Sequence, residues 1–172
     1  MSIELRPSFK VVEPNKLTGL RIGHVLAQQV ALVDNIAHTT FGTTDVLENG
    51  VIVSLDADGT IKNYADGTGM FLVYNEELID GAYVGLDQQG EPFVDGKVYP
   101  RAIALYEGDV FTTDNFAKNG VADTVTDCYA KPVKGVLNLQ VATTGAQFIA
   151  TRTRMPNGKE GFKFTFLNRT LA

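Results

Sequence analysis

The stretch that most constrains the fold is TTDVLENGVIVSLDADGTIKNY, residues 43–64. Asn49-Gly50 is a strong hairpin signal, because a two-residue primed turn needs positive φ, which Asn and Gly reach at low cost. The β-branched run 51–55 follows, and the turn sequence ADG separates it from a second run, 60–64. The pattern predicts a three-stranded meander, about the minimum that is stable by itself. The chain is therefore expected to be a β protein.

Other segments carry the same signal. The run MFLVY (70–74) is bounded by turn sequences and predicts a buried strand. The segments 136–142, 147–154 and 161–167 alternate as strands do, and the last puts its phenylalanines on one face. We predict an antiparallel β-barrel or sandwich with short helical turns. The expected core residues are Val51, Val53, Leu55, Phe71, Val73, Leu137, Leu139, Phe148, Phe164 and Phe166.

Three further segments give less direct predictions. Residues 20–34 fit a helix no better than two strands, and Gly23 argues against a long helix, so we expect strands at 22–27 and 29–33. Thr113-Asp114 predicts the start of a helical turn. Lys131-Pro132 predicts a turn.

Residues 1–17 differ from the rest, and we interpret them as an extended N-terminal arm preceding a single β-rich domain, 18–172. Prolines exclude this segment from a central strand or a helix interior. Phe9, Val11 and Val12 form its apolar cluster, which would be exposed unless it docks on its own domain or on a neighbour. These three residues are candidate partner-binding residues. A frayed terminus is the alternative.

Composition excludes several classes of function. The net charge of -5 argues against nucleic acid and against an anionic membrane surface as partners. One cysteine, Cys128, means no internal disulfide. No apolar run approaches the roughly 20 residues that span a bilayer.

No set of residues predicts catalysis, a metal or a cofactor. His24 and His38 are too far apart for a metal motif and lack a companion cluster. Cys128 has no adjacent base, so we interpret it as an inert thiol. Asp56 and Asp58 lack the remaining ligands of a calcium loop. The sequence therefore favours a protein that is not an enzyme.

Basic residues gather near the C-terminal end of the sequence. They are a solvated face of the last hairpin or a docking surface for an acidic partner, and Arg152 and Arg154 are the candidate partner-binding residues. The complete set is Arg152, Arg154, Lys159, Lys163 and Arg169.

The order LENGVIVSLDADGTI, then MFLVY, then GDVFTTDNF, resembles head decoration (cement) proteins of tailed bacteriophages. This resemblance implies a β-barrel or sandwich without catalysis or cofactor, bound outside an icosahedral shell. It implies the major capsid protein as partner and leaves self-association on the particle open. It also implies synthesis in the host cytoplasm and a final location on the virion head.

Other functions stay open at this point. The second class is another structural part of a phage, such as a head-fibre base or a tail component. A carbohydrate- or ligand-binding β module is the third class, although the chain has no Trp to form a sugar platform.

Overall fold

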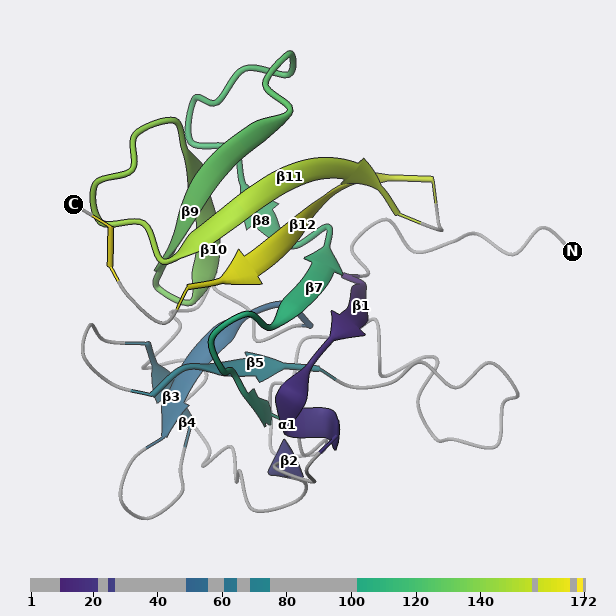
Figure 1. Cartoon of the computed structure of the whole chain (residues 1–172), viewed down its shortest axis with the longest axis vertical. Coiled ribbons are helices and arrows are strands. Elements are labelled where there is room, and N and C mark those ends of the chain that lie inside the picture. Colours follow the sequence, from purple (N-terminus) through teal and green to yellow (C-terminus); the bar gives the residue numbers. More distant parts are fainter. Residues whose placement is uncertain are drawn as a thin grey trace, which may run out of the picture.

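Figure 1 shows the chain as a computed structural model, in which residues 10–21, 25–26, 49–55, 61–64, 69–74, 102–155, 158–167 and 170–171 are described. Their strands form two open sheets, one of seven strands (the large sheet) and one of five (the small sheet). The large sheet lies above the small sheet in this view (Figure 1). In the described residues the sheets fit a sandwich and neither closes into a barrel, so the predicted mainly β, antiparallel class is confirmed.

The large sheet has the strand order β1-β7-β12-β11-β9-β10-β8. Neighbouring strands are antiparallel except β8 and β10, which are parallel. The strands are β1 Val12–Lys16, β7 Val110–Thr113, β8 Phe116–Ala117, β9 Asp127–Val133, β10 Val136–Gln140, β11 Phe148–Arg154 and β12 Glu160–Phe166.

The small sheet has the order β2-β6-β5-β3-β4 and is antiparallel throughout. Its strands are β2 Val25–Leu26, β3 Ile52–Leu55, β4 Ile61–Asn63, β5 Phe71–Val73 and β6 Ala102–Ala104. A short helix, α1 (Thr18–Arg21), follows β1 and contacts β6. A Cβ on Gly19 would lie 2.7 Å from the Ala104 carbonyl oxygen, so the absence of a side chain allows this approach.

The core lies between the sheets and is built from cross-strand rows. In the large sheet, one row crosses four strands, and each of its residues is the direct strand partner of the next: Phe111, Phe164, Ala150 and Cys128. Two large rings beside two small side chains leave room for the opposite sheet. The small sheet contributes the row Ile52, Leu72 and Ile103, all fully buried.

Most of the predicted strands are observed. The segments 51–55, 60–64, 70–74, 136–142, 147–154 and 161–167 contain β3, β4, β5, β10, β11 and β12 in turn. Gly50 has φ 89°, as its turn predicted. Every predicted core residue with a described side chain is buried except Phe71, which is half-buried. The side chain of Leu55, and the first strand of the meander, lie outside the described residues.

Two local predictions are wrong. Thr113-Asp114 begins no helical turn, because only two residues separate β7 from β8 and their polar groups make other bonds. Lys131-Pro132 lies inside β9 and is not a turn. The β9–β11 pairing ends at Ala130, so Pro132 has a strand partner on one side only, where a missing N–H is tolerated. Of the two strands expected in 20–34, only Val25–Leu26 is described.

The described end of the predicted arm belongs to the domain. Residues Val12–Lys16 form β1, which pairs with β7 at an edge of the large sheet. Val12 and Leu17 are buried in the core, while Pro14 is exposed on the edge strand, where proline is tolerated. Residues 10–17 therefore lie on their own domain, one of the two surfaces considered for the arm.

Candidate functional site

The candidate docking residues of the arm are tied to the chain itself. The Val11 N–H donates to Asp114 Oδ1 at 2.8 Å, and the Val11 carbonyl accepts from Thr113 Oγ1 at 2.7 Å. Val12 is only 6% exposed and packs in the core. These contacts hold Val11 and Val12 against their own domain. Phe9 lies outside the described residues.

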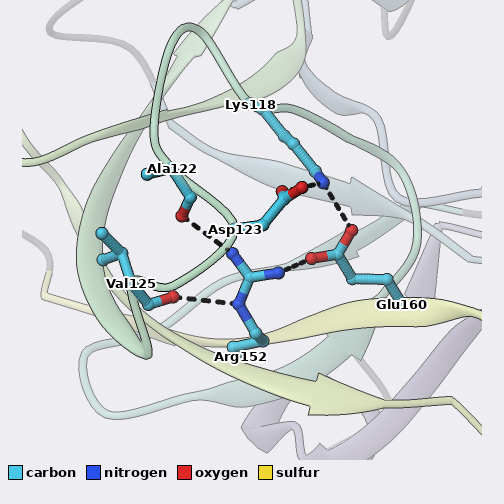
Figure 2. Close-up of polar contacts among 6 residues, drawn as sticks. All are labelled: Lys118, Ala122, Asp123, Val125, Arg152 and Glu160. Atoms are coloured by element: carbon cyan, nitrogen blue, oxygen red, sulfur yellow. Dashed lines mark hydrogen bonds and ion pairs between the residues drawn. The ribbon is translucent and has the colours of Figure 1, made fainter.

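Arg152 is also engaged internally, although the sequence suggested a free cation. Its register opposite Phe162 places both residues on the core-facing side of the β11–β12 hairpin, and its guanidinium lies 5.0 Å from the centre of the Phe162 ring. Its Nε donates to the Val125 carbonyl and its Nη2 to the Ala122 carbonyl, while Nη1 pairs with Glu160 (Figure 2). Arg152 thus holds the segment between β8 and β9.

Figure 2 shows that Glu160 connects Arg152 to Lys118. Lys118 Nζ lies 2.8 Å from Glu160 Oε2 and 2.5 Å from Asp123 Oδ1. The hydrogen bond from Lys118, followed by its positive charge, holds the pKa of the exposed Asp123 carboxyl below its usual value. We call Lys118, Asp123, Arg152 and Glu160 the Arg152 cluster. Its two cations and two anions balance, so it offers no net charge to a partner.

The other described residues of the basic group, Arg154, Lys159 and Lys163, are more accessible, and Arg169 lies outside the described residues. Arg154 is exposed, and its Nε donates to the Gly158 carbonyl at 3.1 Å. Lys163 is exposed on the other face of the hairpin, since its neighbours Phe162 and Phe164 face the core. Lys159 Nζ lies 3.8 Å from Asp114 Oδ2. Among the described docking candidates, Arg154 is therefore the exposed one.

A second set of polar groups is buried between β6 and β7 and centres on Asp109. This carboxylate is fully buried. Its Oδ1 accepts from the N–H and the hydroxyl of Thr18, and its Oδ2 accepts from the Tyr106 N–H at 2.9 Å. Both oxygens are satisfied, as a buried carboxylate requires. Asp109 therefore joins the start of α1 to the turn before β7.

The two sheets meet at a group of hydrogen-bonded residues that we call the sheet junction, all buried except the half-buried Val11: Val11, Asn49, Gly50, Thr113, Asp114 and Asn115. Thr113 Oγ1 accepts from the Asn115 N–H, and Asn115 Nδ2 donates to the Asn49 carbonyl at 2.8 Å. Gly50 packs so closely that a Cβ there would lie 2.7 Å from Thr113 Oγ1. The junction thus connects the residues before β3 to the end of β7.

The phrase GDVFTTDNF, residues 108–116, supplies most of these contacts. Gly108 has φ 83°, Asp109 binds α1, and Phe111 is fully buried in the core. Phe116 contacts Phe162 edge to face, with ring centres 4.9 Å apart. Asp109, Thr113 and Asn115 of this phrase, and one oxygen of Asp114, hydrogen-bond to other parts of the chain, while Asp114 Oδ2 is buried without a hydrogen bond. The observed role of the phrase is therefore to join the sheets.

The predicted inert character of Cys128 agrees with its surroundings. Its side chain is 3% exposed, and burial raises the pKa of the thiol above its usual value. Within the described ranges, no three His, Cys, Asp or Glu residues are placed to hold a metal ion. His24, His38, Asp56 and Asp58 lie outside those ranges.

Comparisons with protein-family models, with curated proteins and with solved structures each find no match to this chain. In the part of the chain that the structure describes, no helix is both long and apolar enough to cross a bilayer.

Sequence reasoning missed the sheet junction and the Arg152 cluster. Asn49 and Asn115 are 66 positions apart, and no local pattern connects them. The signal for Arg152 was present but indirect: it is two residues from Ala150 on a strand whose inner face is apolar, so alternation places it on that face.

Proposed function

We propose that this chain is a non-enzymatic structural virion protein. It binds the outside of a tailed-phage capsid and stabilises the contacts between major capsid subunits. The observation that supports this proposal best is the sheet junction. Polar groups from three distant segments, 11, 49–50 and 113–115, hydrogen-bond to one another and fasten two sheets and an edge strand together.

A cement protein must transmit load between subunits without coming apart. In a sandwich joined only by apolar contacts, the sheets resist sliding through packing alone. Directional hydrogen bonds across the junction, together with the main-chain bond from Ile52 N to the Gly135 carbonyl at 2.8 Å, also fix the sheets laterally. Each bond contributes modestly, about 0.5–1.5 kcal/mol, but they act together.

We assign the attachment surface to exposed side chains of the large sheet. Arg154 is a charged candidate, and the exposed aliphatic side chains Val133, Val141 and Ile149 belong to the large sheet or its edges. Multiple copies on a repeating lattice need only modest affinity each, since bivalent or multivalent attachment raises the overall avidity.

The test is co-sedimentation of the purified protein with heads assembled from the major capsid protein encoded in the same genome. Saturable binding, together with heads that withstand higher temperature, supports the proposal. Failure to bind heads, combined with retention on a glycan column, would favour the carbohydrate-binding alternative. Binding to tails but not to heads would favour a tail component.

Two variants locate the attachment. Arg154→Glu should weaken head binding while leaving the melting temperature unchanged, because its side chain is exposed. Ile149→Asp tests the outer face of the large sheet in the same way, and Thr153→Asp, also exposed on β11, is the matched control for an added charge. If Thr153→Asp also abolishes head binding, the added negative charge, and not the loss of a specific contact, would explain the effect of Ile149→Asp.

A further inference from the structure

Two Asn-Gly pairs of the described residues lie in opposite environments: Asn119-Gly120 is exposed and Asn49-Gly50 is buried. Burial affects how readily asparagine undergoes spontaneous deamidation. In an Asn-Gly sequence, the glycine nitrogen can attack the asparagine Cγ, because no Cβ shields it. The C–N bond to the side-chain amide breaks, ammonia leaves, and a cyclic succinimide forms. Water then opens the ring to aspartate or isoaspartate. Water is the only co-reactant, and asparagine is for this reason a thermolabile residue.

Asn119-Gly120 meets the requirements of this reaction. Both residues are exposed, with φ 47° at Asn119 and 82° at Gly120. A Cβ on Gly120 would meet no atom within 4 Å, so the approach to its nitrogen is open. The turn is closed by the bond from Val121 N to the Lys118 carbonyl, at 2.9 Å. In the described part of the chain, the Gly120 N–H makes no hydrogen bond.

Asn49-Gly50 fails the same requirements. Asn49 is 8% exposed, and its carbonyl accepts from Asn115 Nδ2. The nucleophilic nitrogen of Gly50 is occupied, since it donates to the Val73 carbonyl at 2.9 Å. Thr113 and Asn115 fill the space beside Gly50. Ring closure here requires local opening of the sheet junction, whereas at Asn119 it does not.

We propose that Asn119 is a deamidation site of the folded protein and that Asn49 is protected by the fold. The product has a structural consequence. Isoaspartate adds a methylene to the main chain inside the turn that Lys118 and Val121 close. Either product also adds a negative charge at the residue next to Lys118, whose ammonium group binds Asp123 and Glu160. The reaction therefore alters the turn from which Lys118 joins the Arg152 cluster.

The test follows both sites in one sample. The full-length folded protein is incubated at mildly alkaline pH, digested with chymotrypsin, and analysed by mass spectrometry for the exchange of NH₂ for OH. Isoaspartyl methyltransferase labelling detects isoaspartate. We expect deamidation at Asn119 to be about ten-fold or more faster than at Asn49, because the buried site reacts only through local opening.

The same chain incubated in concentrated urea is the control. Both sites are then Asn-Gly in an unfolded chain, and their rates should converge. Equal rates at the two sites in the folded protein would overturn the proposal, as would an unreactive Asn119 in the folded protein beside a reactive Asn119 in urea. Asn119→Gln should remove the signal at this site and leave the rate at Asn49 unchanged.

Discussion

Replacing Gly50 with alanine tests the sheet junction most directly. Gly50 has φ 89°, a conformation that costs an L-residue about 1–2 kcal/mol. The added Cβ would lie 2.7 Å from Thr113 Oγ1 and 2.9 Å from the Asn115 Cβ. Thr113 cannot move freely, because its hydroxyl donates to the Val11 carbonyl and accepts from the Asn115 N–H.

The magnitude follows from these two effects. Relief of the clash requires Thr113 to weaken two hydrogen bonds, each worth about 0.5–1.5 kcal/mol. If both bonds are weakened and not broken, they contribute about 1–2 kcal/mol together, and with the backbone cost Gly50→Ala should lower the free energy of unfolding by about 2–4 kcal/mol. A domain with about 5–15 kcal/mol of stability remains folded after such a loss, so the variant can be measured.

Gly120→Ala is the matched control. Its φ of 82° is nearly the same, but its Cβ would meet nothing within 4 Å. Gly120→Ala therefore has the same conformational cost at positive φ, and the same reduction in the entropy of the unfolded chain, as Gly50→Ala, but it has no steric clash. The difference between the two variants isolates the packing of the junction.

The assay is urea unfolding followed by far-ultraviolet circular dichroism, since the chain has no Trp for fluorescence. In a Thr113→Ala background, Gly50→Ala should cost less than in the wild type by about 1 kcal/mol or more, because the nearest atom is gone. If Gly50→Ala and Gly120→Ala destabilise equally, the close approach at Gly50 has no energetic weight and the reasoning fails.

Three other predictions concern the core, α1 and the Arg152 cluster. Phe164→Ala should cost about 3–5 kcal/mol in urea unfolding, because the ring is fully buried against Phe111 and Phe148; a cost below about 1 kcal/mol would contradict this packing. Asp109→Asn should cost about 2–3 kcal/mol, because the carboxylate accepts from Thr18 and Tyr106 and an amide group would turn a donor toward donors; unchanged stability would show that these bonds carry no weight. Lys118→Met should return the pKa of Asp123 toward its ordinary value, as followed by NMR titration. Because that pKa is lowered in the fold, the stabilisation from the pair is present above the ordinary aspartate pKa and disappears as the pH falls through the lowered one, so wild type and Lys118→Met should converge in acid.

The strands could be predicted because their signals are local. Alternation placed Leu137, Leu139 and Phe164 in the core, and Asn-Gly gave the positive φ of Gly50. Pairing between distant strands has no such signal. The parallel pair β8–β10 and the position of β1 beside β7 depend on contacts between segments far apart in the sequence.

The same limit explains why the surroundings of Arg152 and Pro132 were not predicted. Arg152 was interpreted by its charge, which suggests solvent, whereas its position on the inner face of β11 placed it over Phe162. Lys131-Pro132 was interpreted by the turn preference of proline, whereas the end of the β11 ladder at Ala130 makes a proline acceptable in β9. In both cases tertiary context decided the outcome.

The structure also changes what the resemblance to cement proteins can mean. GDVFTTDNF is one of the features on which that resemblance rests, and polar groups in it bind α1, Val11 and Asn49. A phrase used in this way constrains how two sheets are joined, so its recurrence would indicate a shared fold before a shared partner. The capsid attachment that we propose would then have to come from surface residues that the fold does not use. Variants of Arg154 and Ile149 therefore test the function, while variants of Gly50 and Asp109 test the fold, and the two sets should separate cleanly in melting and head-binding measurements.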